Sequence, residues 1–174
     1  LTTAVDGAPE VAWSDDAVVL AAASGSIALT LADENSVLTH RDGRILVDDG
    51  VSDLTVVADD IAFLAGESSI VGGGVITLDS SQDNWLYRLG DENHIPDILT
   101  VSQQDLDALD EDWTQLNMGS LDRGLAMELG NTIRLEIPAH LRASTMETTG
   151  LVESGASSLI LEAGQLSVAA NTGL

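Results

Sequence analysis

Apolar and polar residues alternate over short stretches of this chain, and one such stretch occurs twice. Residues 54–65 read LTVVADDIAFLA, and residues 159–170 read LILEAGQLSVAA. An alternating pattern has the period of a strand with one buried face. Asp59-Asp60 in the first copy and Gly164-Gln165 in the second interrupt the pattern in the middle, as a corner would. The matched apolar positions are Leu54/Leu159, Val56/Leu161, Ala58/Ala163, Ile61/Leu166, Phe63/Val168 and Ala65/Ala170.

This repeated pattern of strand, corner and strand predicts the rungs of a β-solenoid. Further short apolar clusters, separated by Gly, Asp, Asn and Ser, predict more strands. Two alternatives stay open: an Asp-Gly pair also makes hairpins, as in a sandwich, and two strand pairs of any β protein can look alike. Residues 1–16 are expected to be a polar approach segment. The further clusters lie at 18–20, 27–31, 45–47, 70–71, 75–78, 116–118, 125–129, 133–137 and 151–152.

The segment 83–113 has a different character and predicts one short helix at 102–112. Ser102 is a favourable N-cap, and Asp105 stands in the capping-box position three residues later. Leu106, Leu109 and Trp113 then follow on one helical face. We expect this helix to pack by that face over an end or side of the strands.

Composition narrows the classes of partner. Aromatic residues make up only 3% of the chain, so the core must consist of Leu, Ile, Val and Ala. The net charge is −23 and no lysine occurs, which excludes nucleic-acid binding and disfavours docking on an anionic membrane. The acidity indicates either a solvated, self-repelling surface or a binder of divalent cations, with calcium the first candidate.

No cysteine occurs, and no apolar run approaches the length of a membrane span, so we expect no membrane insertion. His40, His94 and His140 lack metal-site spacing and are expected to be loop or edge residues. Because the chain begins at Leu1, we expect a piece of a longer polypeptide.

The motifs of nucleophilic enzymes and the P-loop are missing from the sequence. If the chain were a polysaccharide-cleaving enzyme, Arg134 and Arg142 would be the first candidates for the base, although a structural salt bridge is the favoured interpretation of each. Trp85, Tyr87 and Trp113 cluster around the predicted helix and are candidate ligand contacts for sugar rings. The alternative is that they form the local core beneath that helix.

Three segments, VITLDSSQDNWLYRLG at 75–90, LTVSQQDLDAL at 99–109 and DWTQLNMGS at 112–120, resemble the β-helical repeat of filamentous-haemagglutinin-like bacterial surface proteins. The resemblance covers about residues 50–170. It implies a right-handed parallel β-helix, secretion or surface display, and a role in adhesion or as a stalk, and it supplies no catalytic residues.

From these observations we expect an all-β chain, a right-handed parallel β-helix spanning 1–174 as one solenoid segment, with a helix-bearing insertion at about 83–113. We expect a non-enzymatic structural or adhesive role outside the cell or at its surface, without a cofactor unless calcium binds. Neighbouring repeats of the same polypeptide and surface glycans are the expected partners. The competing hypothesis is a carbohydrate-binding or polysaccharide-degrading module.

Overall fold

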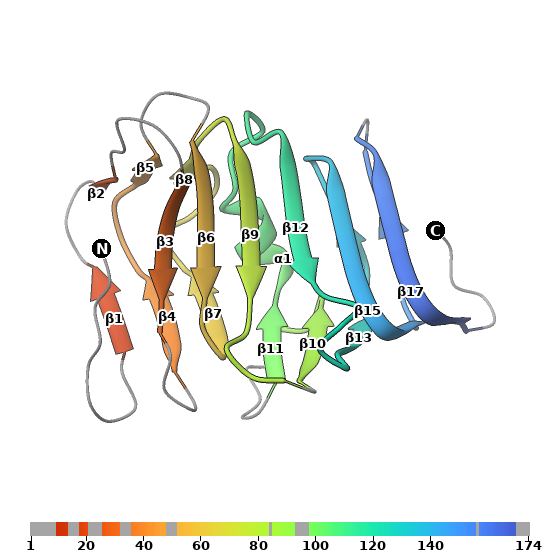
Figure 1. The fold of residues 1–174 in the computed structure, drawn as a ribbon. Coiled ribbons are helices and arrows are strands. Elements are labelled where there is room, and N and C mark those ends of the chain that lie inside the picture. Colours follow the sequence, from red (N-terminus) through yellow and green to blue (C-terminus); the bar gives the residue numbers. More distant parts are fainter. Residues whose placement is uncertain are drawn as a thin grey trace.

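Parallel strands stacked along one axis make up most of the computed structural model (Figure 1). The structure describes residues 10–13, 18–20, 26–31, 36–47, 52–83, 85–92, 98–155 and 157–169. His94 lies outside these residues. Within them every strand ladder is parallel, so the hairpin sandwich is wrong for this part of the chain.

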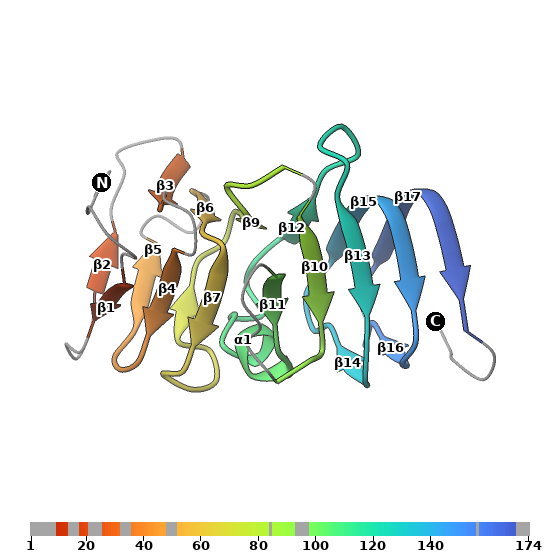
Figure 2. The ribbon, with the colours of Figure 1, turned by 90° about the horizontal axis from the view of Figure 1, so that it is seen from below.

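The strands lie on three sides, and one passage of the chain through the sides makes a rung (Figure 2). Side I holds β1 (Glu10–Trp13), β4 (Val37–His40), β7 (Asp60–Phe63), β11 (Ile98–Val101), β10 (Leu86–Leu89) and β13 (Ala126–Leu129). Side II holds β2 (Val18–Leu20), β5 (Ile45–Val47), β8 (Ile70–Val71), β14 (Ile133–Arg134) and β16 (Val152–Glu153). Side III holds β3 (Ser26–Thr30), β6 (Asp53–Val57), β9 (Val75–Asp79) and β12 (Gln115–Gly119).

Two longer strands, β15 (Ala139–Thr148) and β17 (Leu159–Val168), belong to sides III and I at once. The first half of β15 pairs with β12 and its second half with β13, so the strand turns the corner between the two sides without a loop. β17 follows β15 through the same corner. This shared strand joins side III and the β11, β10 and β13 part of side I into one curled sheet of nine strands, whereas β1, β4 and β7 form a separate sheet.

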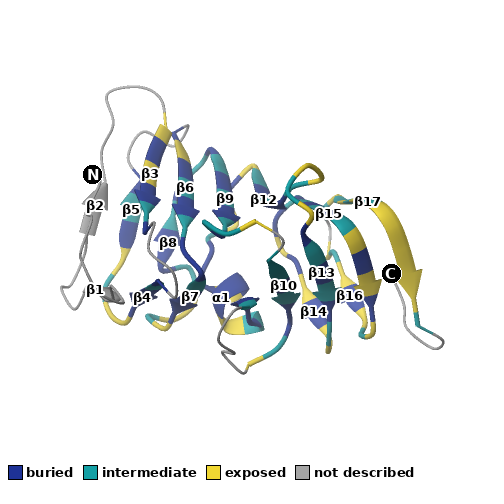
Figure 3. Cartoon of the chain, turned by 60° about the horizontal axis from the view of Figure 1, so that its bottom comes forward, coloured by how far each residue is buried: buried dark blue, intermediate teal, exposed yellow. Residues whose placement is uncertain are grey.

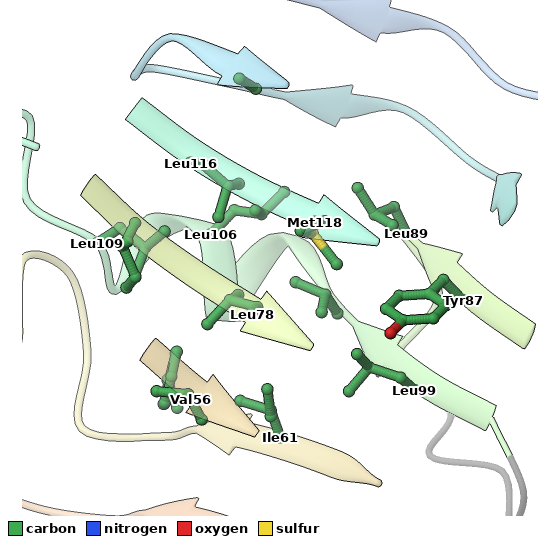
Figure 4. Packing of buried hydrophobic residues seen from close by; sticks show 14 of the residues in the cluster. Val56, Ile61, Leu78, Tyr87, Leu89, Leu99, Leu106, Leu109, Leu116 and Met118 are labelled. Atoms are coloured by element: carbon green, nitrogen blue, oxygen red, sulfur yellow. The ribbon is translucent and has the colours of Figure 1, made fainter. Parts of the chain in front are cut away.

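The register places like residues on top of one another, and this stacking forms the core (Figure 4). On side I, Tyr87 stacks on Met127, which stacks on Met146. The ladders of side III consist mostly of aliphatic residues, as the low aromatic content predicts, because small side chains suit a narrow interior. The two ladders of side III are Ile27-Leu54-Ile76-Leu116-Ala139-Leu159 and Leu29-Val56-Leu78-Met118-Leu141-Leu161.

The repeated sequence pattern does form strand, corner and strand in both places. Residues 54–63 cross from β6 to β7, and 159–168 make the same crossing within β17. The apolar side chains of the first copy are buried, whereas Leu166 and Val168 are 49% and 48% exposed. The second copy differs because the described part of the chain places nothing on its outer side.

The corners between sides III and I carry a polar ladder. The backbone N–H of Asp59 donates to Ser36 Oγ over 3.2 Å, and the hydroxyl of Ser80 donates to Asp59 Oδ1 over 3.0 Å. All three side chains are buried. The polar atoms of successive corners thus satisfy one another where the apolar ladder is interrupted.

The predicted helix exists but is shorter than expected. Helix α1 covers Gln103–Asp107, and Ser102 and Asp105 form both hydrogen bonds of the capping box. The predicted end at residue 112 is wrong, because Leu109 makes a parallel bridge with Ile70 and so continues side II as a strand would. Leu106, Leu109 and Trp113 are buried, as predicted.

The two strands before α1 are part of the sheet. β10 lies between β11 and β13. The chain therefore forms β10, next to β13, before it forms β11, which lies on the other side of β10. β11 lies against β7, without a strand ladder between them among the described residues. β1 falls within the predicted approach segment, and β4 and β15 lie where no strand was predicted.

Candidate functional site

Trp113 lies inside the core. The indole is 1% exposed, and its Nε1–H donates to the backbone carbonyl of Ile70 over 2.9 Å. Gly72 leaves room for the ring, because a Cβ at that position would overlap it. In this arrangement a ligand outside the molecule does not reach Trp113.

Tyr87 is also fully buried and closes a corner. Its hydroxyl donates to Asp79 Oδ1 and accepts from the backbone N–H of Ser80 over 2.9 Å. Burial, together with the adjacent Asp79 carboxylate, raises the pKa of Tyr87 far above its usual value. The alternative in which Tyr87 and Trp113 belong to the core fits their positions.

Trp85 is the partly exposed member of the predicted aromatic group and packs against the core. Its indole Nε1 is buried and has no hydrogen-bond partner. Tyr87 bonds to β9 and its following turn, whereas Trp113 bonds to β8, so the structure does not bring the three rings to one platform. As a ligand contact, Trp85 stays a prediction.

Arg123 organises the corner around Tyr87, and no sequence motif marks this role. Its guanidinium contacts Asp79 and Asp83, each at 2.9 Å, and donates to the backbone carbonyls of Ser80 and Gln82. Burial lowers the pKa of Arg123, but hydrogen bonding to Asp83 and the charge of Asp79 outweigh it. Because 40 residues separate Arg123 from Asp83, no local sequence pattern predicts this set of contacts.

Arg134 and Arg142 do not form a basic centre. Arg134 pairs with Glu136, and its backbone N–H and C=O bond to the side-chain amide of Gln103 at 2.8 and 3.0 Å. Arg142 lies in register with Glu162, and its Nε atom is buried without a partner. Arg134 also lies in register with Glu153 of β16.

The two described histidines have different surroundings. His40 is fully buried, both ring nitrogens lack partners, and burial lowers its pKa against the opposing effect of Asp42. His140 lies at the surface, 3.1 Å from Glu162. Among the described residues, no group of three or more His, Asp or Glu is arranged to hold a metal ion.

A groove of about 490 Å³ runs along side II beside α1, in the size range of small-ligand sites. Between β8 and β14, residues 107–110 bond by their backbone to Ser68 and Ile70. The side-chain amide of Gln103, on α1, bonds to the backbone of Arg134. The groove is lined by Glu67, Ser68, Gln103, Leu106, Asp107, Leu109, Glu111, Thr132, Arg134, Glu136 and Glu153.

A second surface is the outer edge of β17, Leu159–Val168, which we call the terminal edge (Figure 3). Among the described strands, β17 pairs only with β15. Its inward-facing Leu159, Leu161 and Ala163 are half-buried against the core. The terminal edge therefore offers both strand hydrogen bonds and apolar side chains.

No helix in the described part of the chain has the length and apolar character of a membrane span. No protein-family model, curated protein or solved structure matches the sequence.

Proposed function

We propose that the chain is a structural and adhesive segment of a large secreted or surface-displayed bacterial protein, built as a right-handed parallel β-helix. The observation that carries this proposal is the continuous in-register stacking on side III, where each inner strand pairs in parallel with the strand of the rung before it and with the strand of the rung after it. A β-helix of this kind lengthens by adding rungs, and it acts through its outer surface.

The burial of Tyr87 and Trp113 supports a structural role over a sugar-binding one. Both rings are buried in the core, where Tyr87 hydrogen-bonds to Asp79 and Trp113 hydrogen-bonds to the backbone of Ile70. The absence of a metal-ligand group among the described residues gives calcium no identified site. In a longer parent protein, neighbouring repeats of the same polypeptide would cover the ends.

The test combines a glycan array with thermal unfolding, using wild type and Trp85→Ala. A stalk binds no glycan of the array, and millimolar calcium leaves its melting temperature unchanged. The proposal is overturned if wild type binds a glycan that Trp85→Ala loses at an unchanged melting temperature.

The α1 groove favours one alternative, a carbohydrate-binding or polysaccharide-degrading module. Glu111, Glu136 and Glu153 are among its lining residues, and cleavage of glycosidic bonds needs paired carboxylates. A panel of polysaccharides incubated with wild type and Glu153→Gln separates this alternative from the stalk. Products formed by wild type and lost in Glu153→Gln would establish the enzyme.

A further inference from the structure

The terminal edge is long and apolar, and no described strand pairs with its outer side. β17 has ten residues, and its inner side pairs with β15 through nine residue pairs. Ile160, Leu166 and Val168 are 52%, 49% and 48% exposed. Natural sheets protect such edges with lysine, proline, bulges or short strands, because an open edge templates pairing with another chain. None of these devices is present in β17.

The terminal edge is also nearly free of charge in a very acidic chain. Glu162 is the only charged residue of β17, and its carboxylate lies beside His140. The flanking residues 154–158 and 169–174 carry no charge. Local repulsion therefore does not oppose the approach of an identical edge, although the net charge of −23 opposes it at longer range.

The side chains of β17 are complementary to themselves in one antiparallel register. Leu159, Leu161 and Ala163 face inward before the corner, and Leu166 and Val168 face inward after it, since they stack on Met146 and Thr148 of β15. The corner shifts the inward positions from odd to even numbers. A two-fold axis between Ala163 and Gly164 then sets Leu161 opposite Leu166 of a second copy, and Leu159 opposite Val168.

We infer that the terminal edge, where no following rung of the same polypeptide covers it, binds a second copy of this chain through an antiparallel β17–β17 ladder. The axis runs through the corner and exchanges sides III and I, so the inner face of one copy meets the inner face of the other. Directly opposed residues of an antiparallel pair point to the same side. A slip by one residue would set Leu161 against Ser167 or Gln165, so burial of the leucines fixes the register. Ala163 and Gly164 keep the axis free of bulky side chains.

This inference goes beyond the proposed function, because it requires neither adhesion nor a particular handedness. A following rung of the same polypeptide would occupy the same edge in parallel orientation. The two occupants are therefore exclusive and can be told apart. An isologous contact of this kind closes on itself and gives a dimer, whereas parallel stacking of copies would continue into fibres.

The first experiment measures mass in solution by light scattering over about 1–100 μM, a range that covers micromolar dissociation constants. We expect wild type to dimerise with rising concentration, and more strongly at higher salt. Leu166→Lys should remain a monomer over that range. Leu64→Lys is the matched control, because Leu64 is 39% exposed directly after β7, in a different sheet from β17, and its substitution should leave the dimer intact.

Equal behaviour of the two variants, or a monomeric wild type, would overturn the inference. Because the chain has no cysteine, the register can be tested by mixing two single-cysteine variants under mild oxidation. Ile160→Cys mixed with Ser167→Cys should form a cross-linked pair, because these residues oppose each other across the axis. Cross-linking of Ile160→Cys to Ala28→Cys instead would show head-to-tail stacking onto β3 and contradict the antiparallel ladder. Circular dichroism confirms that each variant is folded.

Discussion

The carboxylate of Asp105 accepts a hydrogen bond from the backbone N–H of Phe63 over 2.6 Å, although 42 residues separate them. Phe63 ends β7, and the described residues contain no ladder between β7 and β11. The same carboxylate accepts from the backbone N–H and the hydroxyl of Ser102 at 2.8 and 2.6 Å. One buried side chain therefore caps α1 and replaces a strand partner.

Asp105→Ala should lower the free energy of unfolding by about 2–4 kcal/mol. It removes a helix cap, worth about 1 kcal/mol, and leaves the N–H of Phe63 buried without an acceptor, which costs about 1–3 kcal/mol. Urea denaturation measures the loss. Asp107→Ala is the control, since Asp107 is exposed on the same helix and its carboxylate accepts a hydrogen bond from the side-chain amide of Gln103. A similar loss in both variants would contradict the bridging role of Asp105.

Trp113 and Gly72 should be energetically coupled. Gly72→Ala should destabilise the protein because its Cβ overlaps the indole, and Trp113→Ala should cost about 3–5 kcal/mol through the cavity it leaves. In the double variant Gly72→Ala/Trp113→Ala, the loss should be smaller than the sum of the two single losses. Gly130→Ala is the control, because the nearest atoms would lie 3.8 Å from its Cβ. Strict additivity in a thermal or urea cycle would refute the contact.

The single tyrosine of the chain allows a direct titration of the Tyr87 corner. Its pKa is raised in the folded protein, so the stability that the neutral phenol contributes is present below about pH 10 and is lost as the pH rises further. Phenolate absorbance should therefore appear together with unfolding detected by circular dichroism. A phenolate signal near pH 10 in a folded sample would show that Tyr87 is accessible to solvent.

His40 should make the protein sensitive to mild acid. Its folded pKa lies below the unfolded value of about 6.5, so stability is complete above that value and falls as the pH drops through it toward the folded pKa. Melting temperatures at pH 7.5 and 5.5 should differ more for wild type than for His40→Leu. An unchanged difference in His40→Leu would assign the acid sensitivity to other groups.

The sequence predicted those parts of the fold in which burial leaves a regular period. β6, β9 and β17 have large apolar residues at every second position, and the cap at Ser102 follows a local rule. β15 escaped prediction because small and polar residues, Ala139, Ala143 and Thr148, fill its inward positions and a corner shifts its period.

The candidate site was less predictable because its contacts join distant rungs. Arg123 meets Asp79 across 44 residues, and Gln103 meets Arg134 across 31. Neither pair has a spacing rule, because the number of residues per rung varies where β10 and α1 enter. The residue types of Trp85, Tyr87 and Trp113 do not tell a buried ring from a partly exposed one, so the sequence alone did not separate Trp85 from the other two.

The replacement of backbone ladders by side chains has a mechanical consequence for any rod built this way. Force applied along the stacking axis loads the hydrogen bonds between rungs in tension. Between the rung of β7–β9 and the next, the ladder of β9 with β12 remains. Among the described residues, the bond of Phe63 to Asp105 joins the two rungs on side I, and the Ile70–Leu109 bridge with the backbone bond from Ser68 to Asp107 joins them on side II. A pulled rod should part at this plane, leaving the rungs on either side intact as two separately extensible blocks.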